Sequence, residues 1–476
     1  MRSIRWRNAR SFLWTGLAIL VVPAGSGCVS YRPRPAHEVA FTSHAQTKTD
    51  GDLRVTVAVL DEQETAAVFG VPLYRRGIQP VWLEIENQGD DPYVLSKPSL
   101  DAQYYSPLEA AYVNHFRATR WLPDVGPLSL LFLPALIPGG IEQLSAAVAN
   151  RQMDLDFDEK GFGNGIVPAG ETRSGFVFTT LDEGTKRVPV VLYGTGEQRR
   201  LTFLVRVPGA RLDHHRVDFA GLYREDEVAE VDGEGLRSAL AQLPCCTTSR
   251  DGRTQGDPLN LVIVGDFDDV LHAFRHARWD ETEYVHARSA WRTIASFLFG
   301  KRYRTSPVSD LYVFGRRQDV AFQKVRNTVD DRHHFRLWLA PLRFDGRPVW
   351  IGQASRDVGV RFTLKTSTLT THAIDADVDD ARDYVLGDLV ERQRVGRLGY
   401  AGGVGTAAKS APRTNLTGDP YFTDGFRGVV VLAEPPARLE VFDWDYRPLR
   451  GAAGAAGAPA VARDGSSPSD DDLIER

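Results

Sequence analysis

The sequence predicts an α+β multidomain fold, with an N-terminal β-sandwich followed by an α+β domain that contains a mixed or antiparallel sheet. The chain has 476 residues, which is more than one ordinary domain holds. Its first half shows short apolar–polar alternations separated by turn signals, with no long helical pattern among the predicted strands. Its second half opens on a strand, a tight turn and a helix, and then continues mostly with consecutive strands.

The β-sandwich is predicted over residues 51–210. Residues 53–60 and 81–87 alternate like half-buried strands, and Gln88-Gly89-Asp90-Asp91-Pro92 supplies a turn after the second of them. Further strands are predicted at 173–180, 187–193 and 201–207. The pattern is similar to that of the immunoglobulin-like modules of exported bacterial proteins.

An apolar insertion interrupts the sandwich at about residues 105–160. Its most apolar part, residues 127–140, contains three prolines and is shorter than a membrane span. We favour a helical hairpin packed on the sandwich core. The alternative is an interfacial element that lies against a bilayer.

A charged connector is predicted over residues 211–255 and a second folded domain over residues 256–450. In that domain, residues 261–264 form a buried strand, and Asp266 is the expected N-cap of the helix that follows. Another helix is predicted near residues 287–300. The later strands are predicted at 310–315, 333–342, 349–362 and 428–432, and the Gly/Ala/Ser/Asp-rich tail from residue 451 is predicted to be disordered.

The first 28 residues have the layout of an export signal. Four arginines precede an apolar run over residues 12–24, and Gly25-Ser26-Gly27-Cys28 follows. This segment resembles a bacterial lipoprotein signal, although Gly25 stands where the lipobox usually has Leu. The resemblance implies cleavage before Cys28, lipidation of Cys28 and a mature protein held on a membrane surface. The alternative is plain secretion with a free Cys28.

The residues after the signal refine the expected location. Residues 29–50 are polar and contain proline, so we predict a tether between the lipid anchor and the folded body. Val29, rather than Asp, follows Cys28. We therefore expect a periplasm-facing protein on the outer membrane rather than the inner one.

Composition and motifs limit the function classes. A net charge of −5 gives no electrostatic reason to expect nucleic acid as a partner. The sequence has no zinc-ligand spacing, HExxH motif, Walker loop or dinucleotide fingerprint, so we predict neither a metal nor a cofactor. Besides Cys28, only Cys245 and Cys246 remain. We favour two free or part-buried thiols there over a strained disulfide between neighbours.

The main candidate site lies on a predicted hairpin. In residues 332–339, period-two alternation puts Arg332, His334, Arg336 and Trp338 on one face. The run Phe344-Asp345-Gly346-Arg347 predicts a two-residue turn. If Phe344 pairs with Arg347, His334 lies opposite Asp357 and Arg336 lies opposite Ser355.

This face has two interpretations. As an anion pocket, Arg336 binds a phosphate or carboxylate, while His334, oriented by Asp357, acts as acid or base. As a structural feature, the same residues form a buried polar network. The additional candidate ligand-binding residues are Arg316, Arg332 and Ser355.

A second polar group contains His372, the third candidate catalytic residue, and the acidic residues from Asp375 to Asp383. A histidine with alternating aspartates can bind a metal. The calcium-loop template fails because Asp380 stands where glycine is needed. We favour a helix that starts at Asp377, with acidic residues in its first turn and Val378, Val385 and Leu389 buried.

Six segments of the second domain resemble, in order and spacing, the LssY C-terminal domain family over about residues 256–435. They are 258–265, 308–316, 332–338, 355–359, 371–383 and 419–425. The resemblance implies a domain associated with the bacterial envelope. In some members this domain is joined to membrane segments and to a lipid-phosphatase-like domain, and the family has no assigned biochemical activity.

The leading functional hypothesis is an exported, lipid-anchored protein that binds an anionic ligand or an envelope protein at the membrane surface. Such a protein would be linked to secretion or to envelope lipid metabolism. The rival hypothesis is a hydrolase that acts on a phosphate-bearing envelope lipid or glycan through His334, Arg336 and Asp357. The third is a structural envelope scaffold.

Overall fold

The computed structural model describes residues 30–116, 133–207, 210–284, 305–326, 331–362 and 370–444, with the backbone alone described for residues 133–143, 360–362 and 370–372. The predicted signal with Cys28, the helix at 287–300 and the tail lie outside these residues. The chain divides into two compact units, Met1–Leu181 with Pro189–Leu201 and Asp182–Val188 with Thr202–Arg476. Within the described ranges, no helix is long and apolar enough to cross a membrane.

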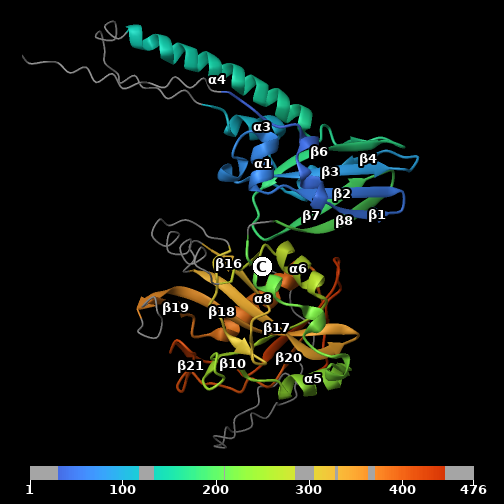
Figure 1. The fold of residues 1–476 in the computed structure, drawn as a ribbon. Coiled ribbons are helices and arrows are strands. Elements are labelled where there is room, and N and C mark those ends of the chain that lie inside the picture. Colours follow the sequence, from blue (N-terminus) through green and yellow to red (C-terminus); the bar gives the residue numbers. More distant parts are fainter. Residues whose placement is uncertain are drawn as a thin grey trace, which may run out of the picture. The chain divides into compact units, whose positions relative to one another are not determined.

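The N-terminal region contains two four-stranded sheets, which confirms that it is sheet-rich, and two strands of the second sheet, at residues 185–193 and 198–206, run across the boundary between the units. One has the order β1-β2-β3-β6, with every neighbouring pair antiparallel, and the other has the order β5-β4-β7-β8. In β2, Leu53, Val55 and Val57 are fully buried and alternate with more exposed residues, as the sequence pattern predicts. The strands are β1 (Gln46–Asp50), β2 (Leu53–Val59), β3 (Ile78–Asn87), β4 (Tyr93–Leu95), β5 (Ile166–Val167), β6 (Thr172–Thr180), β7 (Thr185–Tyr193) and β8 (Gln198–Arg206) (Figure 1).

The prediction of a polar tether is wrong for residues 30–50, which pack onto the first unit. Phe41 is 2% exposed, and its ring lies 5.8 Å from that of Trp82. The Tyr31 hydroxyl donates to Asp156 at 2.6 Å. These two buried aromatic residues anchor an otherwise largely exposed polar segment, since each removes a large apolar area from water. This segment also contains the short helices η1 (Ala36–Glu38) and η2 (Ala40–His44).

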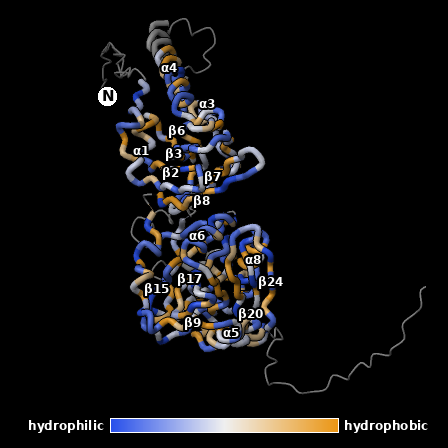
Figure 2. Tube along the Cα trace, turned by 90° about the vertical axis from the view of Figure 1, so that its right-hand side faces the viewer, coloured by the Kyte–Doolittle hydropathy of each residue, from blue (hydrophilic) through white to orange (hydrophobic). Residues whose placement is uncertain are grey.

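The insertion forms helices α3 (Pro107–Val113) and α4 (Leu133–Lys160). Ser106 caps α3 in a capping box with Glu109. From α4, Met153 and Phe157 are fully buried in the core that the first sheet contributes to. The described part of the insertion is therefore a pair of helices packed on the sheet, and α4 carries both hydrophobic and hydrophilic residues (Figure 2). The other helices of this unit are α1 (Glu62–Phe69), η3 (Leu73–Arg76) and α2 (Lys97–Leu100).

The second unit is built around a ten-stranded mixed sheet, which confirms the predicted α+β class. Its main path is β13-β16-β17-β18-β12-β23-β20-β24, while β19 pairs with β18 and β9 pairs with β17. The pairs β12–β23, β20–β24 and β17–β9 are parallel, and the others are antiparallel. The strands are β9 (Ala229–Val231), β12 (Leu261–Val264), β13 (Asp280–Glu281), β16 (Val320–Val325), β17 (Arg332–Phe344), β18 (Arg347–Phe362), β19 (Thr370–Ile374), β20 (Val395–Ala401), β23 (Arg427–Leu432) and β24 (Glu440–Val441).

Helices cover both faces of this sheet (Figure 1). On one face, α6 (Phe267–His276) and α8 (Val378–Glu391) pack against Leu261 and Ile263 of β12. On the other face, α5 (Gly233–Gln242) packs against Val262 and Val264 of the same strand. Burial on both sides explains why β12 is continuously apolar.

The segment predicted as a connector, residues 211–255, is instead part of the second unit. Its strand β9 extends the central sheet, and Leu236 and Leu240 of α5 are fully buried. The apolar pattern of α5 covers only ten residues and lies within a charged segment, so the helix was not recognised in the sequence. Its other elements are η5 (Asp213–Arg216), η6 (Phe219–Gly221), η7 (Glu225–Glu227) and β10 (Cys246–Thr248). Outside the main sheet lie β11 (Gln255–Pro258), β14 (Tyr312–Val313), β15 (Arg316–Arg317), β21 (Arg413–Thr414) and β22 (Pro420–Tyr421).

Cys245 and Cys246 form a disulfide, so the prediction of free thiols is wrong. Cys246 is 4% exposed and begins β10, where it pairs with Pro258. The disulfide therefore lies at the start of β10, an inner strand of the small sheet β11-β10-β14-β15.

Candidate functional site

The predicted hairpin forms, but its register changes along its length. Asp345 and Gly346 both have positive φ, as the two-residue turn requires, and Phe344 pairs with Arg347. Between Leu339 and Arg343 a β-bulge shifts the pairing by two residues. Pro341, which has no N–H to donate, lies inside this bulge.

Because of this shift, His334 and Arg336 have other cross-strand partners than predicted, but both lie on the predicted face of the sheet. His334 pairs with Ser355 rather than Asp357, and Arg336 pairs with Gln353 rather than Ser355. Asp357 lies opposite Arg332 instead. Because side chains alternate with period two, a shift of two residues leaves all of them on the same side of the sheet.

These side chains meet in a closed polar network, which we call the His334 network. His334 Nε2 lies 2.9 Å from Asp357 Oδ1, and Arg332 Nε donates to Asp357 Oδ2 at 2.9 Å. Arg336 donates to Gln353 at 2.6 Å, and Gln353 donates to Ser355 at 2.9 Å. Each of these six residues is at most 6% exposed.

A loop and a neighbouring strand complete the network. Arg336 Nε donates to the carbonyl of Ser309 at 3.0 Å, and Arg332 donates to Gln323 of β16. The prediction missed Gln323 because β16 was not recognised as a strand. The available signal was that Gln323 shares the face of Ala321 and Val325 in the alternation of Val320–Val325.

The electrostatics of the network favour a neutral imidazole. Burial lowers the pKa of His334 to about 4, and Arg336 and Arg332 add to this effect while Asp357 opposes it. At pH 7 the neutral ring donates from Nε2 to Asp357 and presents Nδ1 to Arg336, 3.4 Å away. Burial also lowers the pKa of Arg336.

The other predicted site residues do not join this network. Arg316 of β15 makes a two-point ion pair with Asp319 at 3.0 Å and binds the Tyr223 hydroxyl at 2.9 Å. The backbone of His372 lies in β19 opposite Val360, and its side chain falls outside the described residues. Cys28 falls outside them as well.

The acidic run forms the start of α8, as predicted. Asp377 is the N-cap and accepts from the Asp380 N–H at 3.4 Å, while Val378, Val385 and Leu389 are buried. This start lines an open pocket of about 500 Å³, which we call the acidic pocket.

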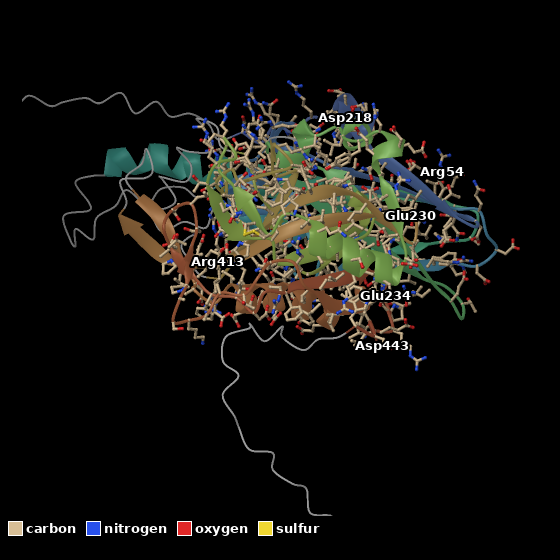
Figure 3. The ribbon with its side chains drawn as sticks, turned by 90° about the horizontal axis from the view of Figure 1, so that it is seen from below. Arg54, Asp218, Glu230, Glu234, Arg413 and Asp443 are labelled. Atoms are coloured by element: carbon tan, nitrogen blue, oxygen red, sulfur yellow. A yellow bond between two sulfur atoms is a disulfide. The ribbon has the colours of Figure 1, made fainter. Side chains whose placement is uncertain are left out.

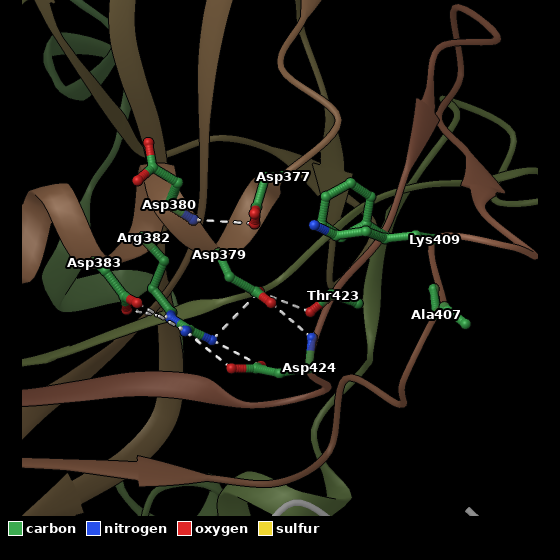
Figure 4. Close-up of a pocket in the computed structure, with 11 residues that line it drawn as sticks. Asp377, Asp379, Asp380, Arg382, Asp383, Ala407, Lys409, Thr423 and Asp424 are labelled. Carbon is green, nitrogen blue, oxygen red and sulfur yellow. Dashed lines mark hydrogen bonds and ion pairs between the residues drawn. The ribbon is translucent and has the colours of Figure 1, made fainter.

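Arg382 is the central cation of the acidic pocket (Figure 4). It donates to Asp424 at 2.9 Å and to Asp383 at 2.8 Å, and these carboxylates outweigh burial and raise its pKa. Asp379 accepts from the Thr423 hydroxyl at 2.8 Å and from the Asp424 N–H at 2.6 Å. The inner carboxylates therefore fasten α8 to the turn at residues 423–426.

A pocket of about 320 Å³ lies at the β-bulge and is mainly apolar. Its aromatic wall is continuous, because the rings of Phe219 and Phe267 are 4.6 Å apart and that of Trp350 is 5.4 Å from Phe219. A pocket of about 350 Å³ lies nearby, lined by Asp213, Arg216 and Arg316 among others. Neither of these pockets nor the acidic pocket is lined by His334, Arg336 or Asp357.

The second unit is therefore an α+β unit with a mixed sheet, helices on both faces and a buried polar network on its long hairpin. Residues 239–426 match the family model described as LssY C-terminus. The chain thus contains an LssY C-terminal domain, as the sequence resemblance indicates, beginning within α5. The match includes the His334 network and the acidic pocket, whereas Asp213 and Arg216 precede it. No curated protein matches the chain.

Proposed function

We propose that this chain is an exported, lipid-anchored envelope protein whose LssY C-terminal domain binds a ligand or partner at the membrane surface without turning it over. The closure of the His334 network is the observation that carries this proposal. Its histidine, arginines and carboxylate satisfy one another inside the protein, and an acid or base must reach the proton that it moves.

The N-terminal sequence supports the location. A basic start, a short apolar run and small residues before Cys28 match the layout of a lipoprotein-type signal. A single lipid chain gives only marginal binding to a membrane, so the multiple acylation of a lipoprotein cysteine suits a stable anchor. Periplasmic exposure on the outer membrane, with a link to secretion or envelope lipid metabolism, is part of this proposal.

The absence of turnover is tested with full-length protein purified in a non-ionic detergent. It is incubated with p-nitrophenyl phosphate and with phosphatidic acid, beside His334→Ala and the exposed control Asp226→Asn. We expect no release of phosphate above the buffer rate from any of the three. Release by the unaltered chain and by the control, lost in His334→Ala, would replace the proposal with the hydrolase hypothesis.

The anchor is tested by metabolic labelling with tritiated palmitate. We expect label on the chain, loss of label in Cys28→Ser, and retained label in the control Cys245→Ser/Cys246→Ser. An unlabelled chain, or label that persists in Cys28→Ser, would contradict lipidation at Cys28.

A further inference from the structure

The pocket of about 350 Å³ beside η5 contains charges that the His334 network does not use. Helices η5 and η6 line one side, and β15 with the two residues after it lines the other. We call it the Asp213 pocket. Its lining residues are Asp213, Arg216, Val217, Asp218, Gly221, Leu222, Arg316, Arg317, Gln318 and Asp319.

Asp213 is a buried carboxyl group with no ion-pair partner among the described residues. The residue is 3% exposed, and neither of its carboxylate oxygens accepts a well-formed hydrogen bond within the described part of the chain, although the Gln318 side chain lies close enough to lower the pKa of the group. Burial raises the pKa of Asp213 to about 7, and the charge of Asp310 adds to this, while Gln318, Arg336 and Arg216 oppose it. A buried acceptor left without a donor is unfavourable and calls for a ligand that donates.

Arg216 is the free cation of the same pocket. Its guanidinium lies over the ring of Tyr284, 4.6 Å from the centroid, and no ion pair involves it among the described residues. Asp213 and Arg216 are the first and last residues of η5, three positions apart on a 3-10 turn, so their side chains leave the same side of it. The structure thus holds a free carboxyl and a free guanidinium close together without pairing them.

Three other charges of this pocket are already paired. Arg316 is held by Asp319 and Tyr223, and Arg317 pairs with Asp310 at 3.2 Å. Asp218, whose side chain Figure 3 labels, is exposed, and no ion pair holds it among the described residues. A ligand therefore meets the unpaired Arg216 and two carboxylates, the buried Asp213 and the exposed Asp218, in the wall around η5.

We propose that the Asp213 pocket binds a phosphoethanolamine group, with the ammonium donating to Asp213 and the phosphate lying against Arg216. This proposal rests on the proposed binding function and names its ligand. A short zwitterion satisfies both free charges at once, and a phosphate accepts the two-point hydrogen bonds that a guanidinium offers. A phosphocholine group fits less well because its quaternary nitrogen has no N–H to donate to the carboxylate.

The test uses full-length protein and soluble sn-glycero-3-phosphoethanolamine, followed by isothermal titration calorimetry. We expect saturable binding that is at least about tenfold tighter than binding of sn-glycero-3-phosphocholine, since one charge-assisted hydrogen bond is lost. Vesicles of phosphatidylethanolamine with phosphatidylcholine, against vesicles of phosphatidylcholine alone, then distinguish a lipid headgroup from a free or glycan-linked source. Preference for the first vesicles points to the lipid, and preference limited to the soluble probe points to the other sources.

Two variants locate the site. Asp213→Asn and Arg216→Gln should each weaken binding of the soluble probe at least about tenfold. The matched controls Asp226→Asn and Arg224→Gln remove charges from an exposed pair on η7 and should leave it unchanged. Arg216 is an exposed residue, so its variant tests the site even if Asp213→Asn folds poorly.

The pH dependence of binding of the soluble probe gives an independent test of the site. An ammonium needs the ionised form of Asp213, so binding should weaken by about tenfold between pH 8 and pH 6. The diester phosphate of the probe does not titrate in this range. The charged groups near Asp213 are Asp310, Arg336, Arg216, Arg316, Arg317, Asp218 and Asp319.

Three outcomes would overturn the proposal: no binding of the soluble probe, equal binding of the choline analogue, or unchanged binding in both Asp213→Asn and Arg216→Gln. Each of these leaves the palmitate and phosphate-release results untouched. The phosphoethanolamine site and the proposed envelope function can therefore fail separately.

Discussion

The His334 network and the Asp213 pocket each contain a buried carboxylate near arginines. The carboxylate is paired in the network and has no ion-pair partner in the described part of the pocket. In the network, Asp357 accepts from both Arg332 and His334. In the pocket, Asp213 has no ion-pair partner among the described residues, and the guanidinium of Arg216 lies over the ring of Tyr284. The two carboxylates are buried to a similar extent, so the burial of a carboxylate alone does not separate a structural polar group from a binding one.

What separates them is whether the buried groups satisfy one another. A satisfied network makes the sheet rigid and specifies one arrangement of its side chains. An unsatisfied carboxyl lowers stability unless a proton or a ligand neutralises it. We therefore infer that the His334 network stabilises the domain and that the Asp213 pocket binds a ligand. Each variant below tests one of these two roles.

The largest effect is expected when the network loses its carboxylate. Asp357→Asn leaves Arg332 buried without its ion-pair partner and removes one of the carboxylates near Arg336, which should lower the free energy of unfolding by about 3–5 kcal/mol. Urea unfolding followed by tryptophan fluorescence measures this. Asp226→Asn, which breaks an exposed pair, should change the same quantity by less than about 0.5 kcal/mol. A small loss in Asp357→Asn would mean that the network does not stabilise the domain.

Removing the unpaired carboxyl of Asp213 should raise the free energy of unfolding, whereas removing the paired carboxyl of Asp357 should lower it. The pKa of Asp213 is raised from 3.8 to about 7, so the folded state binds a proton that the unfolded state has released between these values. Stability contributed by this group therefore falls as pH rises from about 4 to 7. Asp213→Asn removes the penalty and should stabilise the free protein at pH 8, by at most about 4 kcal/mol, and have little effect near pH 4.

Thermal unfolding at pH 8 and pH 4.5 measures this difference. Asp319→Asn is the matched comparison, because Asp319 is 1% exposed in the same wall but paired with Arg316. That substitution should destabilise the protein at pH 8. Destabilisation by Asp213→Asn at pH 8 would show that Asp213 has a partner in the protein and would remove it as the free group of the pocket.

The sequence predicts the network well because one local pattern determines it. Alternation in residues 332–339 and the Asp345–Gly346 turn set both the strand and the face that carries His334. The bulge at Pro341 changes the partners, and its two-residue size preserves the face. The start of α8 at Asp377 was predictable for a similar reason, since a cap and an apolar stripe are local signals.

The Asp213 pocket was not predictable in this way. Its residues come from the segment 213–222, which is rich in charge and has no strand or helix period, and from β15, about 95 residues further along the chain. From the local sequence pattern, residues 213–222 were predicted to be part of a connector. Only its packing onto the second unit shows that Asp213 is buried, because burial of a charged residue depends on distant contacts. For the same reason the burial of Tyr31 and Phe41 was missed.

An intermediate effect is expected from His334 itself. His334→Gln keeps a polar side chain but breaks the contact with Asp357, which should lower the free energy of unfolding by about 2 kcal/mol at pH 7.5. The pKa of His334 is lowered from 6.5 to about 4, so its contribution is present above pH 6.5 and is lost as pH falls to about 4. The difference between the two proteins should shrink over this range. A pH-independent difference would mean that His334 is not held neutral.

The smallest effect on stability is expected from Arg216→Gln, the pocket's counterpart of an arginine change in the network. Arg216 has no ion pair in the described part of the chain, and its contact with Tyr284 is of a kind that contributes about 0.5–1 kcal/mol at an exposed site. Arg332→Gln, which removes a 3% exposed guanidinium from Asp357, should lower stability several times more. Urea unfolding of both variants compares them directly. Similar losses would show that Arg216 is as firmly committed to the folded structure as Arg332, and so is not a free cation that awaits a phosphate.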